Sequence, residues 1–246
     1  MKGIILAGGT GSRLLPLTRA TNKSLLPMGR RTIVEHVLST LTCAGIDDVV
    51  LITGTEHIGA IVSQLGSGRD HGCQMTYRVQ DEPLGIAHAL GLCESFVGGD
   101  RFAVILGDNI FEDVGEVAES VRAFGSSDDD YGLFVKQVSD PERFGVVEYD
   151  GDPLAERPIV NIHEKPAWPP SNDAVLGLYV YTSRVFDVIH TLKPSKRGEY
   201  EISDVNRHLV QRTIGRAHRV KGGWIDAGTH ESYQRACRMV QCKDVT

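Results

Sequence analysis

The sequence predicts an α/β fold, with a mixed and mostly parallel sheet flanked by helices and a second half that is rich in strands. Two observations lead to this fold class. Over the first half, short apolar runs bounded by turn residues alternate with segments of helical periodicity, which is typical of a parallel sheet with crossover helices. From about residue 131, strand-like runs follow one another through turn-rich connections. Because no repeat or linker separates the halves, we expect one domain over residues 1–246.

The first half contains predicted strands at residues 3–7, 49–52, 75–80 and 102–106. Each is a short apolar run, as expected of a strand that is buried on both faces of a sheet. Between them, apolar residues recur at helical spacing in 33–41, 58–65 and 87–93. This alternation predicts right-handed strand–helix–strand crossovers.

The second half is predicted to form strands at 131–135, 145–149, 159–163 and 176–181. Helical patterns return near the end of the chain, at 184–192, 202–212 and 230–240. The second half should therefore extend the sheet and close it with further helices.

Composition limits the classes of partner. The chain has a formal net charge of −6, which argues against a nucleic acid or an anionic membrane as partner, because both require a basic face. It has no apolar run of the roughly 18 residues that span a bilayer, and no signal-peptide pattern. Its five scattered cysteines contain no C-x-x-C pair, so neither a disulfide framework nor a zinc site is indicated. We expect a cytoplasmic protein.

A glycine-rich loop directly follows the first strand. Gly8, Gly9 and Gly11 remove the Cβ atoms that would keep a phosphate away from the backbone. The loop is neither a dinucleotide-binding fingerprint, since Leu14 stands where a third glycine is needed, nor a P-loop, since Ser12 stands where a lysine is needed. A phosphate cradle is one interpretation, and a tight turn without a ligand is the other.

Two cations lie on the same stretch of chain. Arg13 ends the glycine loop and Lys23 follows ten residues later, ahead of Leu-Leu-Pro. A planar guanidinium suits bidentate phosphate contact, and an ammonium supplies a compact charge. Since open α/β sheets bind ligands at the carboxyl ends of their strands, these residues favour a phosphate site there.

With these motifs the sequence resembles the sugar-1-phosphate nucleotidylyltransferases, and within them the thymidylyl-transferring members. The likeness covers nearly the whole chain and includes the motif Gly8-Gly9-x-Gly11-x-Arg13 with Lys23, and the segments 80–87, 106–109, 143–147, 164–166, 177–179, 197–202 and 224–229. It implies a Rossmann-like fold of the nucleotide-diphospho-sugar transferase type. The half over about 1–130 would bind the nucleotide, and the half over about 131–246 would bind the sugar phosphate.

The resemblance also implies the reaction and the metal. We expect an enzyme that transfers a nucleotidyl group from dTTP to glucose 1-phosphate, giving dTDP-glucose and pyrophosphate, with Mg²⁺ held by Asp108 and Asp226. Two carboxylates suit this hard cation, whose remaining ligands are usually water and substrate phosphates. A sugar phosphate is already anionic at neutral pH, so the nucleophile needs no general base. Read alone, Asp108-Asn109 is more often a turn or a helix cap than a metal ligand, and only its context among the other motifs favours the metal.

Further roles are carried over by resemblance alone. The catalytic residues would be Arg13, Lys23, Asp108 and Lys165. Gln80 can read a pyrimidine edge because an amide both donates and accepts hydrogen bonds. The nucleotide-binding residues would be Leu6, Gly8, Gly9, Gly11, Gln80, Pro83 and Gly85. The sugar-phosphate-binding residues would be Gly145, Glu164, Lys165, Tyr179 and Arg197, although Tyr179 could be an ordinary core residue and Glu164-Lys165 a solvated strand end.

Two other functions stay open. The same chemistry could use UTP or CTP, another sugar 1-phosphate, or a small phosphate or phosphonate acceptor. A non-catalytic nucleotide-sugar sensor would keep the fold, but it would be expected to lose one of Arg13, Lys23, Asp108 or Asp226, and all four are present. Relatives usually continue through further helices, so we expect a short form without that C-terminal extension. A homo-oligomer, either a dimer or a tetramer, is expected by analogy.

Overall fold

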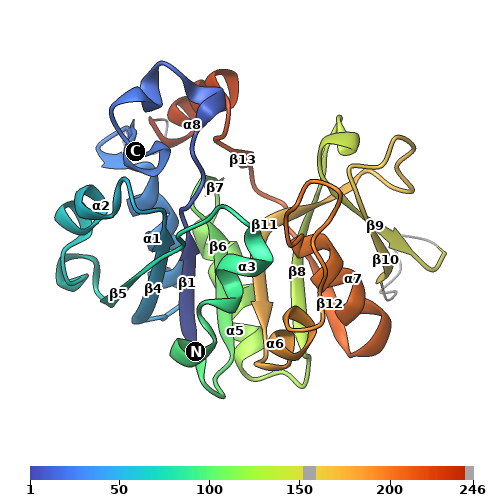
Figure 1. The fold of residues 1–246 in the computed structure, drawn as a ribbon. Helices are drawn as coiled ribbons and strands as arrows, with labels where there is room; N and C mark the ends of the chain where they lie inside the picture. Colours follow the sequence, from blue (N-terminus) through green and yellow to red (C-terminus); the bar gives the residue numbers. More distant parts are fainter. Residues whose placement is uncertain (152–158, 242–246) are drawn as a thin grey trace.

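A central mixed sheet organises the molecule. The computed structural model describes residues 1–151 and 159–241. Within these residues nine strands form one sheet in the order β10-β9-β11-β6-β1-β4-β5, with β8 paired to β11 and β12 paired to β8 (Figure 1). The strands are β1 (Lys2–Leu6), β4 (Asp48–Thr53), β5 (Gln74–Val79), β6 (Phe102–Leu106), β8 (Tyr131–Gln137), β9 (Gly145–Tyr149), β10 (Ile159–Glu164), β11 (Asp173–Tyr181) and β12 (Gly215–Arg219).

The first half of the sheet is parallel. β6, β1, β4 and β5 lie side by side in the same direction, with Ile4 of β1 opposite Val50 on one side and Val104 on the other. Gly3 allows close packing on this central strand, because a Cβ there would lie 2.9 Å from the Leu41 side chain. The apolar runs of β1, β4 and β6 are buried on both faces, as their sequence predicts. β5 differs from the expectation: it is the edge strand, and its residues are exposed or only half-buried.

β11 connects the two halves. It runs antiparallel to β6, with Leu178 opposite Ile105, and also antiparallel to β8 and β9. The second half therefore continues the sheet of the first half. The predicted mixed sheet is confirmed.

Helices cover both faces of the sheet. The helices are α1 (Ile33–Cys43), α2 (Ile58–Leu65), α3 (Ile86–Gly91), α4 (Glu94–Val97), α5 (Val114–Gly125), α6 (Arg184–Ile189), α7 (Ile202–Arg212) and α8 (His230–Gln241). Apolar residues of α1, α2, α5 and α8 belong to one core cluster, and those of α3, α4, α6 and α7 belong to a second. A capping box between Thr32 and Glu35 begins α1.

Two short antiparallel pairs lie outside the central sheet. β7 (Asn109–Phe111) pairs with β13 (Trp224–Asp226), and β2 (Pro27–Met28) pairs with β3 (Arg31–Thr32). Single-turn 3₁₀ helices occur at η1 (Ser12–Leu14), η2 (Leu17–Arg19), η3 (Lys23–Leu25), η4 (Arg69–His71) and η5 (Pro141–Arg143). The β7–β13 pair brings the end of the chain back to the end of β6.

The structure differs from the expected elements in several places. The helix expected at 87–93 corresponds to α3, which ends at Gly91, and the short helix α4 that follows it was not expected. The helix expected at 184–192 ends at Ile189. The helix α5 and the strands β7, β12 and β13 were not expected either. The strands were missed because β7 and β13 are short and β12 carries polar residues. No helix in the described part of the chain is long and apolar enough to cross a membrane.

Candidate active site

A cleft of about 510 Å³ lies between the two halves. One end is built from the glycine loop after β1 and from residues that follow β5 and β6, which are parallel strands ending at the same edge. Its other end is built from β9, β10, β11 and the start of α7. Segments that are far apart in the sequence therefore form the walls of the cleft.

The structure brings nearly all the expected site residues to this cleft. Its walls include Leu6, Gly8, Gly9, Arg13, Lys23, Gln80, Pro83, Gly85, Asp108, Gly145, Glu164, Lys165, Tyr179, Arg197 and Asp226. Gly11 is not among the lining residues. Its φ is +65°, and a Cβ there would lie 2.9 Å from the Thr18 side chain, so this glycine shapes the loop instead of facing the cleft.

The β7–β13 pair brings two carboxylates together. Asp226 stands opposite Asn109 in this pair, and the Ala227 N–H donates to the Asp108 carbonyl oxygen at 2.8 Å. Asp108 is 7% exposed. In the described part of the chain, Oδ1 of Asp226 is buried and accepts no hydrogen bond.

The two carboxyl groups are shifted in opposite directions. Burial opposes ionisation of Asp108, but the adjacent Lys23 ammonium outweighs it and lowers the pKa of Asp108. Burial, followed by repulsion from Asp108, raises the pKa of Asp226 to about 6. A cation placed between them would favour both ionised forms, and it would give the unpartnered oxygen of Asp226 a partner.

This oxygen pair fits a hard divalent cation. In residues 1–151 and 159–241 no group of three or more His, Cys, Asp or Glu side chains forms a complete metal cage. A pair of carboxylates that leaves several positions open is the arrangement that Mg²⁺ tolerates, since it retains water and substrate phosphate ligands.

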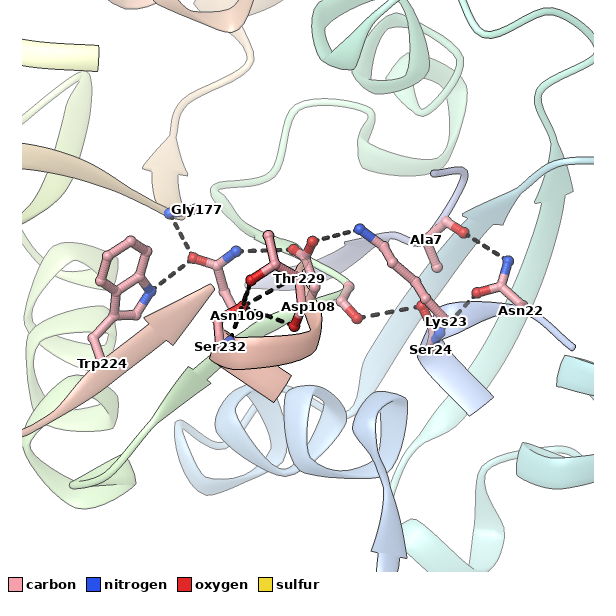
Figure 2. A network of polar contacts seen from close by, with 11 residues as sticks. Ala7, Asn22, Lys23, Ser24, Asp108, Asn109, Gly177, Trp224, Thr229 and Ser232 are labelled. Atoms are coloured by element: carbon pink, nitrogen blue, oxygen red, sulfur yellow. Dashed lines mark hydrogen bonds and ion pairs between the residues drawn. The ribbon is translucent and has the colours of Figure 1, made fainter. Parts of the chain in front are cut away.

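Lys23 forms an ion pair with Oδ2 of Asp108. Local contacts fix its turn: the Asn22 side chain accepts from the Ser24 N–H at 2.8 Å, and the Ser24 hydroxyl donates to the Gly107 carbonyl oxygen at 3.3 Å (Figure 2). A Cβ on Gly9 would lie 3.2 Å from Nζ of Lys23. Glycine at this position thus leaves room for the ammonium in the loop.

Arg13 lies next to Asp226. A Cβ on Gly228 would lie 3.0 Å from Nη2 of Arg13 and 2.8 Å from Oδ1 of Asp226, which places the guanidinium beside the turn after β13. Arg13 is therefore close to Asp226, and Lys23 pairs with Asp108.

Asn109 connects three elements, and the sequence did not identify it. Its Oδ1 accepts from the Gly177 N–H at 2.9 Å and from Nε1 of Trp224 at 2.8 Å, while its Nδ2 donates to Oδ1 of Asp108 at 3.0 Å (Figure 2). This leaves the other carboxylate oxygen of Asp108 facing Lys23. Asn109 thus orients the carboxylate.

The far end of the cleft contains a further cation, Lys165. Lys165 directly follows β10 and has a φ of +44°, the only left-handed non-glycine residue in the described chain. Its Nζ lies 3.1 Å from Oε1 of Glu164, whose other oxygen accepts from the Ser203 hydroxyl. The backbone N–H of Lys165 donates to the Phe144 carbonyl oxygen at 2.9 Å.

Arg197 and Tyr179 complete this end. Arg197 makes a bidentate pair with Glu201, with both oxygens 2.9 Å from Nη2, and this carboxylate raises the pKa of Arg197. Tyr179 is buried, stacks on Tyr181 at 5.9 Å and has a pKa raised by burial. Sequence reasoning missed Arg143, Glu201, Ser203 and Asn206, which also line the cleft.

The fold and the site together define an α/β protein of the nucleotidyltransferase class, with a glycine loop, two cations and two carboxylates at the strand ends. The chain belongs to the nucleotidyl transferase family, whose family model matches residues 2–242.

Several individual proteins are similar to this chain. It is 41% identical over 247 residues to a glucose-1-phosphate thymidylyltransferase of Neisseria meningitidis, covering 98% of this chain and 83% of that protein. A crystal structure from Bacillus anthracis, provisionally described as a glucose-1-phosphate thymidylyltransferase in complex with sucrose, is 50% identical with a TM-score of 0.90, covering 97% of this chain and 94% of that one. A UDP-glucose pyrophosphorylase complexed with UDP-glucose is 26% identical with a TM-score of 0.84, covering 98% of both chains.

Proposed function

We propose that this protein is an enzyme that transfers a thymidylyl group from dTTP to glucose 1-phosphate, giving dTDP-glucose and pyrophosphate. The observation that carries the proposal is the single cleft in which Arg13, Lys23, Asp108 and Asp226 lie at one end and Lys165 at the other. Its relatives named glucose-1-phosphate thymidylyltransferase support the choice of substrates.

In the proposed reaction, a phosphate oxygen of glucose 1-phosphate attacks the α-phosphorus of dTTP. A new P–O bond forms as the bond between the α-phosphorus and the bridging oxygen breaks, and that oxygen leaves with pyrophosphate. The attacking phosphate is already a dianion for the most part near neutral pH, so no residue has to remove a proton. The task of the protein is to bring two anions together and to stabilise the charge on the leaving group.

The cationic side chains divide this task by position. Arg13, which ends the glycine loop, and Lys23, which begins η3, would bind the triphosphate, with Arg13 stabilising the departing pyrophosphate. Lys165 would hold the sugar phosphate, and Glu164 would accept hydrogen bonds from sugar hydroxyls. Gly145, Tyr179 and Arg197 would complete the sugar pocket.

We further propose that Asp108 and Asp226 hold Mg²⁺, as the family typically uses a divalent metal. When bound, this ion would neutralise phosphate charge and hold the triphosphate in one orientation. Lys23 pairs with Oδ2 of Asp108, so its ammonium stands beside a carboxylate that would hold the ion.

Two further proposals rest on the family resemblance alone. The enzyme would work in the cytoplasm, where nucleoside triphosphates and sugar phosphates are available, and it would form a dimer or tetramer. Sedimentation velocity would test the assembly, and a single monomeric species across a wide concentration range would contradict it.

The test of function is pyrophosphate release from dTTP, UTP, CTP, GTP and ATP, each with glucose 1-phosphate and Mg²⁺, with EDTA as control. We expect the fastest release with dTTP and none with EDTA. Faster release with UTP or CTP would show that dTTP is not the preferred nucleotide. Assays with other phosphates in place of glucose 1-phosphate would test the acceptor. Binding of dTTP without release from any acceptor would indicate a sensor.

A further inference from the structure

We propose that His88 is a positioning residue for base recognition: it holds the side-chain amide of Gln80 so that its carbonyl oxygen, and not its nitrogen, faces the nucleotide. This inference rests on the proposed function of the nucleotide end of the cleft. It extends that function by assigning the source of discrimination between uracil-type and cytosine bases.

The surroundings of Gln80 fix which way its amide faces. Gln80 follows β5, is 8% exposed, and its backbone N–H donates to the Thr53 carbonyl oxygen at 2.9 Å. Its Nε2 lies 3.3 Å from the carbonyl oxygen of Gly85. Because a backbone carbonyl can only accept a hydrogen bond, the group that faces Gly85 must be the amide nitrogen.

His88 receives the second hydrogen of this nitrogen. Nε2 of Gln80 lies 2.9 Å from Nδ1 of His88. Since the amide nitrogen only donates, Nδ1 accepts, and the neutral imidazole carries its proton on Nε2. Both hydrogens of the Gln80 amide are thereby used on the side away from the glycine loop.

The His88 ring is itself held in place. It stacks on Tyr200 with 6.2 Å between ring centroids and 29° between the planes. The Tyr200 backbone bonds the segment before and within α3, accepting from the Ala87 N–H at 3.1 Å and donating to Leu84 at 2.8 Å. A ring fixed in this way can fix the amide that it contacts.

The carbonyl oxygen of Gln80 is left facing the glycine loop. A Cβ built on Gly8 would lie 3.2 Å from Oε1 of Gln80, so this oxygen lies against the loop that forms the nucleotide end of the cleft. Among the described residues, no side chain or backbone group donates a hydrogen bond to it. The cleft therefore offers the base a hydrogen-bond acceptor at this position.

An acceptor at this position discriminates between pyrimidines. Thymine and uracil carry a hydrogen on N3 and can donate to Oε1, whereas N3 of cytosine carries a lone pair and repels it. A site that is built to receive an N–H disfavours an analogue that lacks it, because a buried polar group is then left unpaired. The 5-methyl group of thymine is not distinguished by this contact.

The test compares binding of dUTP and dCTP, which share sugar and triphosphate and differ only at this edge of the base. Dissociation constants are measured by calorimetry with Mg²⁺ at about pH 8 and without sugar phosphate, so that no turnover occurs. His88→Leu removes the acceptor at similar size, and His88→Asn keeps an acceptor near the place of Nδ1. Thermal melting checks that each variant folds, and His88→Met replaces the leucine variant if that one does not melt cooperatively.

We expect the wild type to prefer dUTP, His88→Leu to reduce the preference by roughly three- to tenfold, and His88→Asn to keep most of it. The inference is overturned if the wild type shows no such preference, if leucine leaves the preference unchanged, or if leucine and asparagine reduce it equally. Turnover of dTTP with glucose 1-phosphate by the wild type is measured separately. If the wild type turns over and His88→Leu keeps the preference for dUTP over dCTP, only this inference is wrong.

If the wild type does not turn over but its preference for dUTP depends on His88, only the proposed function is wrong. If the wild type binds neither nucleotide, both are wrong.

Discussion

Asp226 is the residue on which the proposed metal site depends most directly. Its Oδ1 is buried without a hydrogen-bond partner in the described chain, although Arg13 lies beside the same turn. A buried acceptor without a partner is costly for folding, and it is retained where a ligand supplies the missing interaction.

Replacing Asp226 by Asn should leave the fold intact and lower kcat by about 10²- to 10³-fold, the size typical for loss of one preorganised electrostatic group. Steady-state rates at saturating Mg²⁺ measure this effect, and a Mn²⁺ titration should show weaker binding. Asp70→Asn, which changes an exposed aspartate in η4, is the matched control. A near wild-type rate for Asp226→Asn would remove this residue from the site.

The raised pKa of Asp226 also predicts a pH dependence of stability. In the unfolded chain an aspartate ionises near pH 3.9, whereas in the folded chain burial and the neighbouring Asp108 raise the pKa of Asp226 to about 6. The protonated form contributes its full stability below the unfolded pKa. Between these pKa values the unfolded chain releases a proton that the folded chain retains, so this stability is lost as the pH rises and the loss is complete above about 6.

Urea unfolding in EDTA at a series of pH values measures this effect. The free energy of unfolding of the wild type, relative to Asp226→Asn, should fall between about pH 4 and 6 and then level off. A relative stability that rises over this window would contradict the assignment. Added Mg²⁺ should restore stability above about pH 6 if it binds the ionised pair.

At the scale of elements, the contact between β11 and β7 positions the carboxylate of Asp108, a proposed metal ligand. Gly177 of β11 lies directly against Asn109, since a Cβ there would lie 2.6 Å from Nδ2 of that side chain. Asn109 in turn holds Asp108. A single methyl group on β11 should therefore disturb a carboxylate that it does not touch.

Gly177→Ala should lower Mn²⁺ affinity and turnover by about 10- to 100-fold, as is typical when a group behind a metal ligand is displaced. Calorimetric Mn²⁺ titration and kcat measure the two effects, and circular dichroism shows whether the sheet is retained. The control is Gly59→Ala in α2, where a Cβ would meet nothing within 4 Å. Equal behaviour of the two variants would exclude this role for Asn109.

The sequence predicts elements well where apolar residues are periodic. β6, β9 and α7 have the bounds expected from their patterns, because each carries a clear apolar run or stripe. β7 and β13 are three residues each and have no pattern to read. Asn109 could not be identified because its partners Gly177 and Trp224 lie 68 and 115 residues away, and only the folded sheet brings them together.

The motifs identified residues that line the cleft better than residues that hold those side chains in place. The family pattern marks residues that face substrate, and the structure places Arg13, Lys23, Gln80 and Lys165 in one cleft as expected. Gly11 belongs to the same motif but shapes the loop instead of lining the cleft. The spacing of the glycines alone could not distinguish these two roles. His88 and Ser203 were overlooked because they contact Gln80 and Glu164 only in the folded chain, and no spacing in the sequence indicates such contacts.

At the scale of the whole molecule, the cleft takes its walls from both halves of the chain, so ligands should stabilise the fold as a unit. Nucleotide with Mg²⁺ at about 100 times its dissociation constant adds about 2.7 kcal/mol, which raises Tm by about 5–10 °C for a chain of this size. Mg²⁺ alone should shift Tm much less, because Lys23 occupies Asp108. Thermal scans with dTTP, Mg²⁺, both, and both with excess EDTA measure this, and an equal shift with Mg²⁺ alone would contradict the role of the ion pair.

The continuous sheet also sets the distance between the glycine loop and Lys165, where the two substrates are proposed to bind. From β1 at the glycine loop, the order runs through β6 and β11 to β9 and β10 beside Lys165, and neighbouring strands are spaced about 4.8 Å apart. β11 joins the halves by backbone hydrogen bonds to β6 and β8, so a wider separation would break hydrogen bonds within the sheet. For the proposed reaction, we therefore expect the loops at the strand ends to adapt to acceptors of different size, while the strands keep the spacing of the reacting groups.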